Sequence, residues 1–423
     1  MKKINPGDYL SGLNIDVMRF GLEAVTNLLS RFGDPQNDYP AILIGGTNGK
    51  GSTAAMTASI LHRAGYRVGL YTSPHLVDVR ERIVVSGRKI SRRQFADILS
   101  EIHDLAADPV TYFEVLTAAA FIYFRRRQVD IAVMEVGLGG RLDATNVCHP
   151  LVSVITSIGL EHTAYLGKTL TAIAGEKAGI IKPCGICVTG ATQEKALRVL
   201  EACCRRQQAT LYRLGREIGI TFRTDGSFGY RGIKKNWERL EPALHGRHQA
   251  ANAALALAAV EVAATKGFPV DDQAVNEGLK QTHWEARMEI LSDRPVFLLD
   301  GAHNPSGISM LVRTLREDYP GKRLILILAV LQDKDYRTML KKILPLASVT
   351  IIPQLVARRA LAADDLAREA RAMGFRAFAA DSAREAVLRA LRHAKKSDVI
   401  CAAGSLYLAG EIKTIISSDA FLW

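Results

Sequence analysis

Short apolar runs alternate with Ala- and Leu-rich stretches along most of the chain. The runs are four or five residues long and rich in β-branched side chains, which predicts buried strands, and the longer stretches predict helices. Strands are expected at 41–44, 68–71, 131–135 and 152–156, and helices at 52–64, 113–126, 169–180 and 250–265. This alternation is typical of a parallel sheet covered by helices, so the predicted fold class is α/β.

The same pattern begins again near residue 285. Five more buried strands are expected at 295–299, 324–329, 349–352, 376–379 and 399–402, with helical stretches between them. We therefore predict two domains, residues 1–287 and 288–423, the second a smaller doubly wound unit. Neither domain has a GxGxxG sequence after its first strand, so a dinucleotide cofactor is not predicted.

The charge of the chain favours anionic partners. Lys and Arg number 55 against 43 Asp and Glu, which gives a net charge of +12. Nucleic acid, an acidic membrane surface and small polyanions such as nucleotides would all suit this excess. With 423 residues, 48% of them apolar and 23% charged, the composition is that of a soluble globular protein of two or three domains.

No segment predicts passage across a membrane. The longest apolar run, residues 324–331, has eight residues, against about 20 for a spanning helix. The first residues lack the apolar segment of a signal peptide, so we expect a cytoplasmic protein with no membrane partner. The CxxC pair of Cys184 and Cys187 is followed by the adjacent Cys203 and Cys204, a poor spacing for zinc, so buried or incidental thiols are expected.

The most specific local motif is GGTNGKGS at residues 45–52. It follows a predicted strand and opens a predicted helix, where backbone N–H groups and the helix dipole favour a phosphate. Lys50 can reach the outer phosphates of a nucleotide, and the hydroxyl of Ser52 or Thr53 can reach Mg²⁺. The motif is not a strict Walker A sequence, because Ile44 replaces the first glycine and a glycine separates the lysine from the serine. A glycine-rich turn that only caps a helix is the alternative.

Several other polar residues follow predicted strands. Glu135 ends the run VDIAVME, where a carboxylate beside a phosphate loop is the expected metal ligand, although a solvated strand end would also explain it. Taken singly, Ser73 is typical of a turn before proline, His162 of a structural histidine, and Lys177 of a surface lysine on a helix. The glycine-rich segment at residues 137–146 permits a tight loop over the site.

Taken together, these segments resemble folylpolyglutamate synthase/dihydrofolate synthase, a branch of the Mur ligase superfamily. The motifs that carry the resemblance are GTNGKGS at 46–52, TSPHL at 72–76, TYFEVLTAAAF at 111–121, EVGLGGRLDATN at 135–146, LEH at 160–162, GEKAGIIKP at 175–183, HGRHQAANA at 245–253, DGAHNP at 300–305 and GSLYLAGE at 404–411. Two segments depart from the common pattern: GLEH replaces GLDH, and WEAR replaces a WPGR-like segment but keeps Arg287. The implied fold is a P-loop Mur-ligase-type ATPase domain followed by a smaller Rossmann-like domain.

The resemblance implies a role for each matching position. The ATP-binding set is Asn48, Gly49, Lys50, Gly51, Ser52, Asn252, Arg287 and Asp300. The set that holds Mg²⁺, expected as two ions, is Ser73, Glu135 and His162. The catalytic set is Lys50, Lys177, Arg287 and His303. Lys177 is expected to be carbamylated, because a carbamate can hold a metal or its waters whereas a free ammonium repels it.

The implied substrate site binds a pterin acid. Its expected members are Met18, Arg19, Phe20, Thr111, Tyr112, Phe113, Glu114, Leu142, Asp143 and Ala144, with Ser405 near the incoming glutamate. Without the resemblance, simpler explanations exist for the motifs nearer the C-terminus: DGAHNP as a strand-to-helix turn and HQAANA as a core helix.

The implied activity is ATP-dependent ligation of L-glutamate to dihydropteroate, to the γ-carboxylate of reduced folyl-glutamates, or to both, through an acyl phosphate. ATP, glutamate and the pterin acids are all anions, which accounts for the positive net charge without a nucleic-acid partner. A monomer is expected.

Three alternatives stay open at this point. A Mur-type cell-wall amino-acid ligase shares the phosphate loop, but only 44 residues precede Gly45, fewer than a UDP-sugar domain is expected to need. A nucleic-acid-dependent P-loop ATPase would suit the charge, but basic runs such as residues 125–127 lack interleaved aromatic side chains. A non-catalytic nucleotide-binding regulator would not need the retained catalytic and metal-binding residues.

Overall fold

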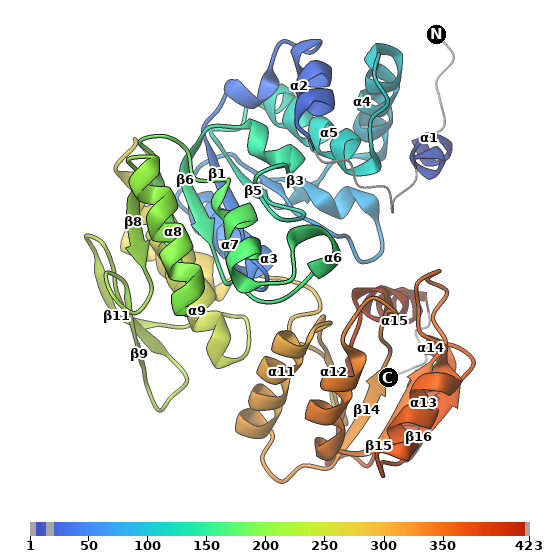
Figure 1. Ribbon diagram of the computed structural model, residues 1–423. Coiled ribbons are helices and arrows are strands. Elements are labelled where there is room, and N and C mark those ends of the chain that lie inside the picture. Colours follow the sequence, from blue (N-terminus) through green and yellow to red (C-terminus); the bar gives the residue numbers. More distant parts are fainter. Residues whose placement is uncertain (1–5, 14–20, 419–423) are drawn as a thin grey trace. The chain divides into compact units, whose positions relative to one another are not determined.

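The computed structural model describes residues 6–13 and 21–418, and its contacts divide the chain into two compact units. The first comprises Met1–His75, Val79–Ala243 and Gln249–Thr282, and the second comprises Leu76–Asp78, Leu244–His248 and His283–Trp423. The last segment of the second unit thus begins at His283, whereas the predicted domain boundary follows Arg287. The limits of the functional domains stay a prediction. Each unit combines a sheet with helices, which confirms the α/β class (Figure 1).

A mostly parallel sheet of eight strands forms the centre of the first unit. The strands are β1 (Ala41–Gly45), β2 (Val68–Tyr71), β3 (Ile83–Val85), β4 (Arg88–Lys89), β5 (Ile131–Glu135), β6 (Pro150–Ile155), β7 (Ile186–Thr189) and β8 (Thr210–Arg213). Their order is β4-β3-β2-β5-β1-β6-β7-β8; β3 and β4 pair antiparallel at one edge, and the other strands run parallel. Since β1 lies between β5 and β6, the loops that follow these three strands meet at one edge of the sheet.

Helices cover both faces of this sheet. The helical elements of the unit are α1 (Pro6–Gly12), α2 (Glu23–Ser30), η1 (Pro35–Asn37), α3 (Lys50–Arg63), η2 (Val79–Arg82), α4 (Arg92–Leu105), α5 (Tyr112–Arg126), η3 (Ala144–Val147), α6 (Thr163–Leu166), α7 (Leu170–Ala178), α8 (Glu194–Arg206), α9 (Arg247–Ala264) and α10 (Asp272–Lys280). One apolar core joins α2, α4, α5, α7 and α8 to strand residues such as Leu43 and Met134. The neighbouring residues Ile42 and Ile44 point to the other face because side chains alternate along a strand. There α3 and α10 pack closely, since a Cβ on Gly278 would lie 2.5 Å from the Cα of Ile60.

A small antiparallel sheet follows the large one and was not predicted. Its strands, in the order β11-β10-β9, are β9 (Gly219–Phe222), β10 (Phe228–Arg231) and β11 (Asn236–Leu240). The buried carboxylate of Glu261, on α9, accepts hydrogen bonds from the Tyr230 hydroxyl (2.9 Å) and from the backbone N–H groups of residues 233–235 (2.6–3.1 Å). One glutamate therefore anchors the β10–β11 turn to α9.

The second unit is a doubly wound sheet of six strands. The strands are β12 (Glu289–Asp293), β13 (Val296–Leu299), β14 (Leu324–Leu328), β15 (Ala347–Pro353), β16 (Ala377–Ala380) and β17 (Val399–Ala403), in the order β12-β13-β17-β14-β15-β16. Its helical elements are α11 (Pro305–Asp318), α12 (Tyr336–Ile343), η4 (Leu344–Leu346), α13 (Ala363–Ala372), α14 (Ala383–His393) and α15 (Leu406–Ser418). The five predicted strands are confirmed; the added strand, β12, pairs antiparallel with β13 at one edge. One core packs α11, α12 and α13 on the sheet, and a second core packs α14 and α15 on its opposite face.

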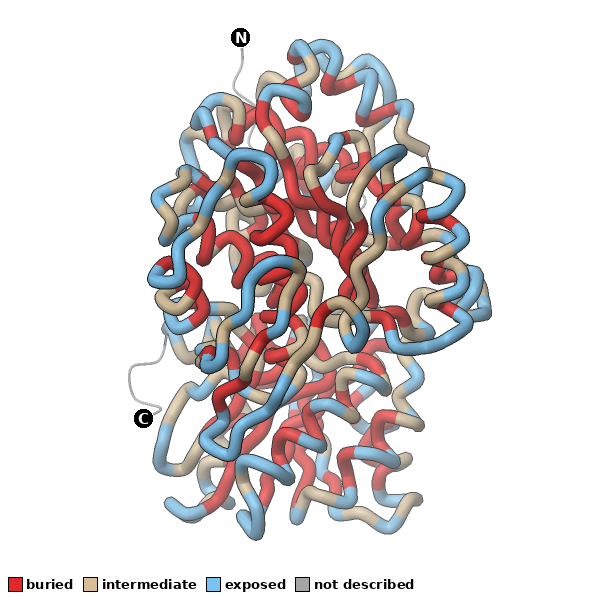
Figure 2. The backbone as a smooth tube through the Cα atoms, turned by 90° about the vertical axis from the view of Figure 1, so that its left-hand side faces the viewer, coloured by how far each residue is buried: buried red, intermediate tan, exposed pale blue. Residues whose placement is uncertain are grey.

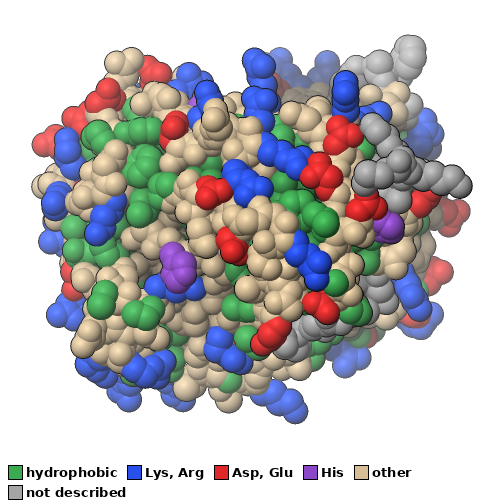
Figure 3. Space-filling model, turned by 90° about the horizontal axis from the view of Figure 1, so that it is seen from above, with side chains coloured by type: hydrophobic (Ala, Val, Ile, Leu, Met, Phe, Trp, Pro, Cys, Tyr) green, Lys and Arg blue, Asp and Glu red, His purple; other side chains and the backbone are tan. Residues whose placement is uncertain are grey.

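Burial and surface charge follow from these layers. The central strands and the inward sides of the helices are buried, while loops and outer helix faces are exposed (Figure 2). Lys and Arg are interspersed with Asp and Glu on the face seen in Figure 3, rather than gathered in one basic patch. Within residues 6–13 and 21–418, no helix combines the length and the apolar character needed to cross a membrane.

Candidate active site

The loop between β1 and α3 is held in a conformation that needs glycine. Gly46 has φ +142° and Gly49, which precedes α3, has φ +87°. A Cβ on Gly46 would lie 1.9 Å from Thr156 Oγ1, and one on Gly49 would lie 2.3 Å from Asn252 Oδ1. The loop therefore passes directly against the end of β6 and against α9, and larger residues would not fit at either position.

Two residues after β6 fix the backbone of this loop. Ser157 Oγ accepts a hydrogen bond from the Asn48 N–H (3.0 Å), and Thr156 Oγ1 donates to the Asn48 carbonyl (2.7 Å). The Thr47 N–H donates to the Ser157 carbonyl (2.8 Å). Sequence reasoning missed Thr156 and Ser157, although a Thr-Ser pair at the end of a strand beside the loop strand was a signal for them.

Two lysines converge on one carbonyl group of the loop. Lys50 Nζ donates to the carbonyls of Gly46 and Thr47 (3.2 Å each), and Lys177 Nζ donates to the Gly46 carbonyl at 2.8 Å. Lys177 is buried, with 4% of its surface exposed. Burial, and next the positive charge of Lys50, lower the pKa of Lys177 from 10.5 to about 7. Lys177 therefore carries a neutral, nucleophilic amine at a pH where ordinary lysines are charged.

The predicted metal ligands follow three strands of the sheet. Glu135, at the end of β5, is 4% exposed, and its Oε2 accepts a hydrogen bond from the Ser73 N–H at 2.9 Å. The two residues meet because β2 and β5 are adjacent parallel strands. His162 lies half-buried before α6, with φ +51°. A carboxylate, a hydroxyl and an imidazole can hold a divalent cation. The buried carboxylate of Glu135 ends the strand that pairs with β1, which leads into the phosphate loop, and this position suits Mg²⁺ with a nucleotide.

The predicted substrate segments come together around one glycine. A Cβ on Gly137 would lie 2.5 Å from the Phe113 ring and 3.2 Å from Asp143 Oδ2. Asp143 is buried; burial raises its pKa, although the N–H of Leu138 (2.8 Å) and that of Thr145 (3.0 Å) donate to its carboxylate. Its neighbours Leu142 and Ala144 are half-buried and buried, respectively. Residues 111–114 and 142–144 thus form one cluster at the edge of the sheet.

The start of α5 fixes the first of these segments. Thr111 and Glu114 form a capping box: the Thr111 N–H donates to Glu114 Oε2 (2.7 Å), and the Glu114 N–H donates to Thr111 Oγ1 (3.3 Å). Glu114 Oε1 is buried and has no hydrogen-bond partner among the described residues. The guanidinium of Arg82, a buried residue that sequence reasoning missed, lies 5.6 Å from the centre of the Tyr112 ring. The predicted contacts at Met18, Arg19 and Phe20 lie outside the described residues.

In the second unit, two motifs lie side by side. The N–H of Asp300, after β13, donates to the carbonyl of Ala402 in β17, and the Gly404 N–H donates to the Ala302 carbonyl (2.9 Å each). DGAHNP and GSLYL thus leave neighbouring parallel strands, and Ser405 is buried at the start of α15.

Asp300 and His303 have defined partners there. The buried carboxylate of Asp300 accepts hydrogen bonds from the N–H groups of Met288 and Ala302 (2.9 Å each). His303 Nδ1 lies 2.7 Å from the Gly301 carbonyl. Burial is the main cause that lowers the pKa of His248; the charge of Asp300 raises it, and the charge of Arg287 lowers it further. His248, which was not among the predicted site residues, therefore lies near Asp300 and Arg287.

Comparisons with known proteins decide the family. The Mur ligase middle domain matches residues 44–260, and the Mur ligase glutamate ligase domain matches residues 286–406. The dihydrofolate synthase/folylpolyglutamate synthase of Bacillus subtilis is 35% identical over 408 residues, which cover 93% of this chain and 94% of that protein. The chain belongs to the folylpolyglutamate synthase/dihydrofolate synthase branch of the Mur ligases.

Solved structures of this family share the whole architecture. Escherichia coli FolC in complex with DHPP and ADP matches with a TM-score of 0.91 and 31% identity, over 97% of this chain and 96% of that one. The bifunctional folylpolyglutamate synthase/dihydrofolate synthase of Yersinia pestis, complexed with AMPPNP and a Mn ion, matches with a TM-score of 0.89 and 29% identity, over 97% of both chains. The predicted family and two-domain ligase fold are confirmed. The comparisons do not support a cell-wall ligase or a nucleic-acid-dependent ATPase.

Proposed function

We propose that this protein is an ATP-dependent ligase that joins L-glutamate to dihydropteroate and to the γ-carboxylate of reduced folyl-glutamates. The observation that carries the proposal is the convergence of Lys50 and Lys177 on the carbonyl of Gly46, within a glycine-rich loop that precedes a helix. The relatives that match nearly the full chain are named for both activities. The reactants are anions, so the reaction needs positive charge at this loop.

The proposed reaction has two steps. A carboxylate oxygen of the pterin substrate attacks the γ-phosphorus of ATP, the bond to the bridging oxygen breaks, and ADP leaves with that electron pair. The amine of glutamate then attacks the carbonyl carbon of the acyl phosphate, loses a proton, and expels inorganic phosphate. Lys50 is proposed to lower the repulsion between the carboxylate and the triphosphate by placing an ammonium beside the phosphates. No nucleophilic side chain is required.

The remaining predicted residues receive roles consistent with their chemistry. Ser73, Glu135 and His162 would hold Mg²⁺, proposed as two ions, which neutralise phosphate charge when bound. Asn48, Gly49, Gly51, Ser52, Asn252, Arg287 and Asp300 are proposed to bind the nucleotide. His303 and Ser405 are proposed to act near the incoming glutamate, and the cluster around Gly137 is proposed to bind the pterin. The monomeric state and the cytoplasmic location stay predictions.

One assay tests the proposal. Purified protein is incubated with Mg-ATP, L-glutamate and either dihydropteroate or tetrahydrofolate, and products are read by mass. We expect one glutamate added to each acceptor and one ADP formed per amide bond. Lys50→Ala should abolish both products, whereas Lys182→Ala, which removes a partly buried lysine bonded to the Asn146 carbonyl, should retain them. ATP hydrolysis without glutamate incorporation into either acceptor would refute the proposed function.

A further inference from the structure

Arg287 lies in a turn whose backbone is unusual on both sides. Ala286 has φ +52° and Met288 has φ +50°, a region that residues with a Cβ rarely adopt. Of the eight non-glycine residues with positive φ in the described chain, Ala286 and Met288 alone are buried. Such a backbone persists only where its surroundings impose it, and it often occurs at functional sites.

Three hydrogen bonds impose this conformation. The Met288 N–H donates to Asp300 Oδ2 (2.9 Å), the Gly301 N–H donates to the Ala286 carbonyl (2.8 Å), and the Ala286 N–H donates to Glu289 Oε2 (2.8 Å). Two of the three acceptors are therefore carboxylate oxygens. The turn keeps its shape only as long as both carboxylates keep their orientation.

The Arg287 side chain packs tightly in the resulting position. Its Nη1 donates to the carbonyl of Ala286 at 2.8 Å. A Cβ on Gly301 would lie 2.3 Å from that nitrogen and 2.6 Å from Leu406 Cδ2. The direction of the guanidinium is thus coupled to the backbone on which it stands.

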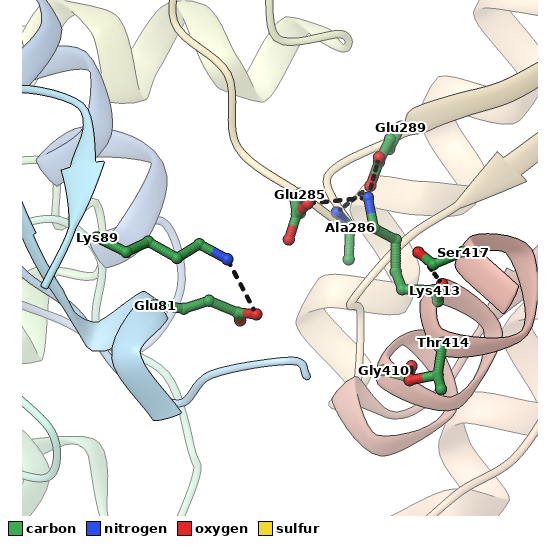
Figure 4. Close-up of polar contacts among 9 residues, drawn as sticks. All are labelled: Glu81, Lys89, Glu285, Ala286, Glu289, Gly410, Lys413, Thr414 and Ser417. Carbon is green, nitrogen blue, oxygen red and sulfur yellow. Dashed lines mark hydrogen bonds and ion pairs between the residues drawn. The ribbon is translucent and has the colours of Figure 1, made fainter. Parts of the chain in front are cut away.

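A lysine from the last helix fixes one of the two carboxylates. Lys413 Nζ, on α15, lies 2.7 Å from Glu289 Oε1 and 3.0 Å from Glu285 Oε1 (Figure 4). The side chains of Lys413 and Glu289 are 18% and 13% exposed, so water screens this pair less than a surface pair. Burial alone would lower the pKa of Lys413, but its hydrogen bonds to the two glutamates outweigh burial and raise it. Lys413 therefore stays charged, and both oxygens of Glu289 are occupied.

This cluster is not a vacant metal site. His283, Glu285 and Glu289 place possible ligand atoms within 4.8 Å of one another, the one such group found among the described residues. The ammonium of Lys413 already bridges the two carboxylates, so a cation that belongs to the chain itself takes the place of a metal (Figure 4).

We propose that Lys413 is a positioning residue that aims Arg287, by orienting Glu289 so that it holds the buried turn at residues 286–288. The proposal rests on the proposed function, because Arg287 is assigned there to the nucleotide site. Lys413 itself touches neither ATP nor the reacting atoms, and its effect passes through the turn.

The test compares four variants in steady-state kinetics with glutamate and pterin saturating. Lys413→Met should lower kcat/KM for ATP at least tenfold, since a displacement of about 1 Å can cost about a hundredfold. Lys413→Arg, which can still bridge two carboxylates, should recover most of this loss. Glu289→Gln should behave like Lys413→Met, and it serves as the second probe if Lys413→Met does not fold. The control, Arg323→Met, breaks a 3.0 Å ion pair with the buried Asp398 in the same unit and should leave kcat/KM unchanged.

A double variant separates positioning from a general loss of stability. If Lys413 acts through Arg287, then Arg287→Gln with Lys413→Met should be no slower than Arg287→Gln alone. Losses that multiply, or a Lys413→Met enzyme with the kcat/KM of the wild type while Arg287→Gln is impaired, would overturn the proposal. If Arg287→Gln itself kept full activity, the assignment of Arg287 under the proposed function would fail instead.

Discussion

The buried amine of Lys177 makes carbamylation a quantitative expectation. Its pKa is lowered from 10.5 to about 7, first by burial and next by Lys50. At pH 7.5 about three quarters of such amines are neutral, against about one in a thousand for an ordinary lysine. Because the neutral amine is the form that adds CO₂, Lys177 should form a carbamate near neutral pH while surface lysines do not. Between pH 6 and 8 its neutral fraction rises from about 10% to about 90%.

The assay is ¹³C NMR under a fixed partial pressure of labelled CO₂. We expect one protected carbamate signal that grows between pH 6 and 8 and is absent from Lys177→Met. Lys182→Met is the matched control, because burial also lowers the pKa of Lys182, yet its amine donates to the Asn146 carbonyl (2.7 Å) rather than to the phosphate loop. The same signal in Lys177→Met, or a midpoint near 10.5, would refute the reasoning.

Stability gives a second readout of the same burial. A lysine whose pKa is lower in the folded than in the unfolded state destabilises the fold at any pH below its pKa in the unfolded state. This penalty grows as the pH falls from 10.5 to about 7 and is constant at lower pH, at about 1.4 kcal/mol for each unit of pKa difference. In CO₂-free buffer at pH 7, Lys177→Met should therefore resist urea better than the wild type, although it loses ligase activity. Equal stability of the two proteins from pH 7 to 10 would contradict the burial argument.

Three further substitutions test other parts of the structure. Gly49→Ala should weaken ATP binding at least tenfold by calorimetry, because its Cβ would meet Asn252 at 2.3 Å, whereas Gly65→Ala, also at positive φ but with nothing within 4 Å, should not. Glu261→Ala should lower the free energy of unfolding by about 2–3 kcal/mol in urea titrations, since four donors lose their acceptor; a change below about 0.5 kcal/mol would show that water replaces it. Asp300→Asn should lower stability by about 1–3 kcal/mol and raise the KM for ATP, because an amide oxygen can satisfy one of its two backbone donors while the amide nitrogen faces the other; an unchanged KM would separate Asp300 from the nucleotide.

The central strands and the phosphate loop were predictable because their signals are local. A continuously apolar run such as Ala41–Gly45 predicts a buried strand. The glycines that follow it indicate that another group lies close to the backbone there. The outer strands β3, β4, β7 and β8 of the large sheet, the small sheet of β9, β10 and β11, and the edge strand β12 were missed. The strands of the small sheet mix polar and apolar residues, as in GITF and NWERL, because each is partly exposed to solvent.

The supporting residues could not be predicted, because tertiary contacts alone define them. In the sequence, Glu261 is an ordinary polar residue of an Ala-rich helix. Its role becomes visible only in the fold, where its carboxylate accepts hydrogen bonds from the β10–β11 turn. Lys413 lies far along the chain from Glu289, and nothing in the sequence LYLAGEIKTIISS of the last helix distinguishes it from a solvated lysine. The positive φ of Ala286 likewise has no local cause, since alanine favours the opposite region.

The two units thus hold a backbone segment at positive φ by different means. In the first, the positive φ values of the phosphate loop lie at glycines, so its conformation costs little and hydrogen bonds to Thr156 and Ser157 are enough to select it. In the second, the turn around Arg287 uses residues with a Cβ, so its conformation must be enforced by buried carboxylates and by the lysine that orients one of them. A glycine loop tolerates the loss of one contact, whereas an enforced turn relaxes when one is removed. Substitutions distant from the reacting atoms should therefore change activity more often around Arg287 than around the phosphate loop.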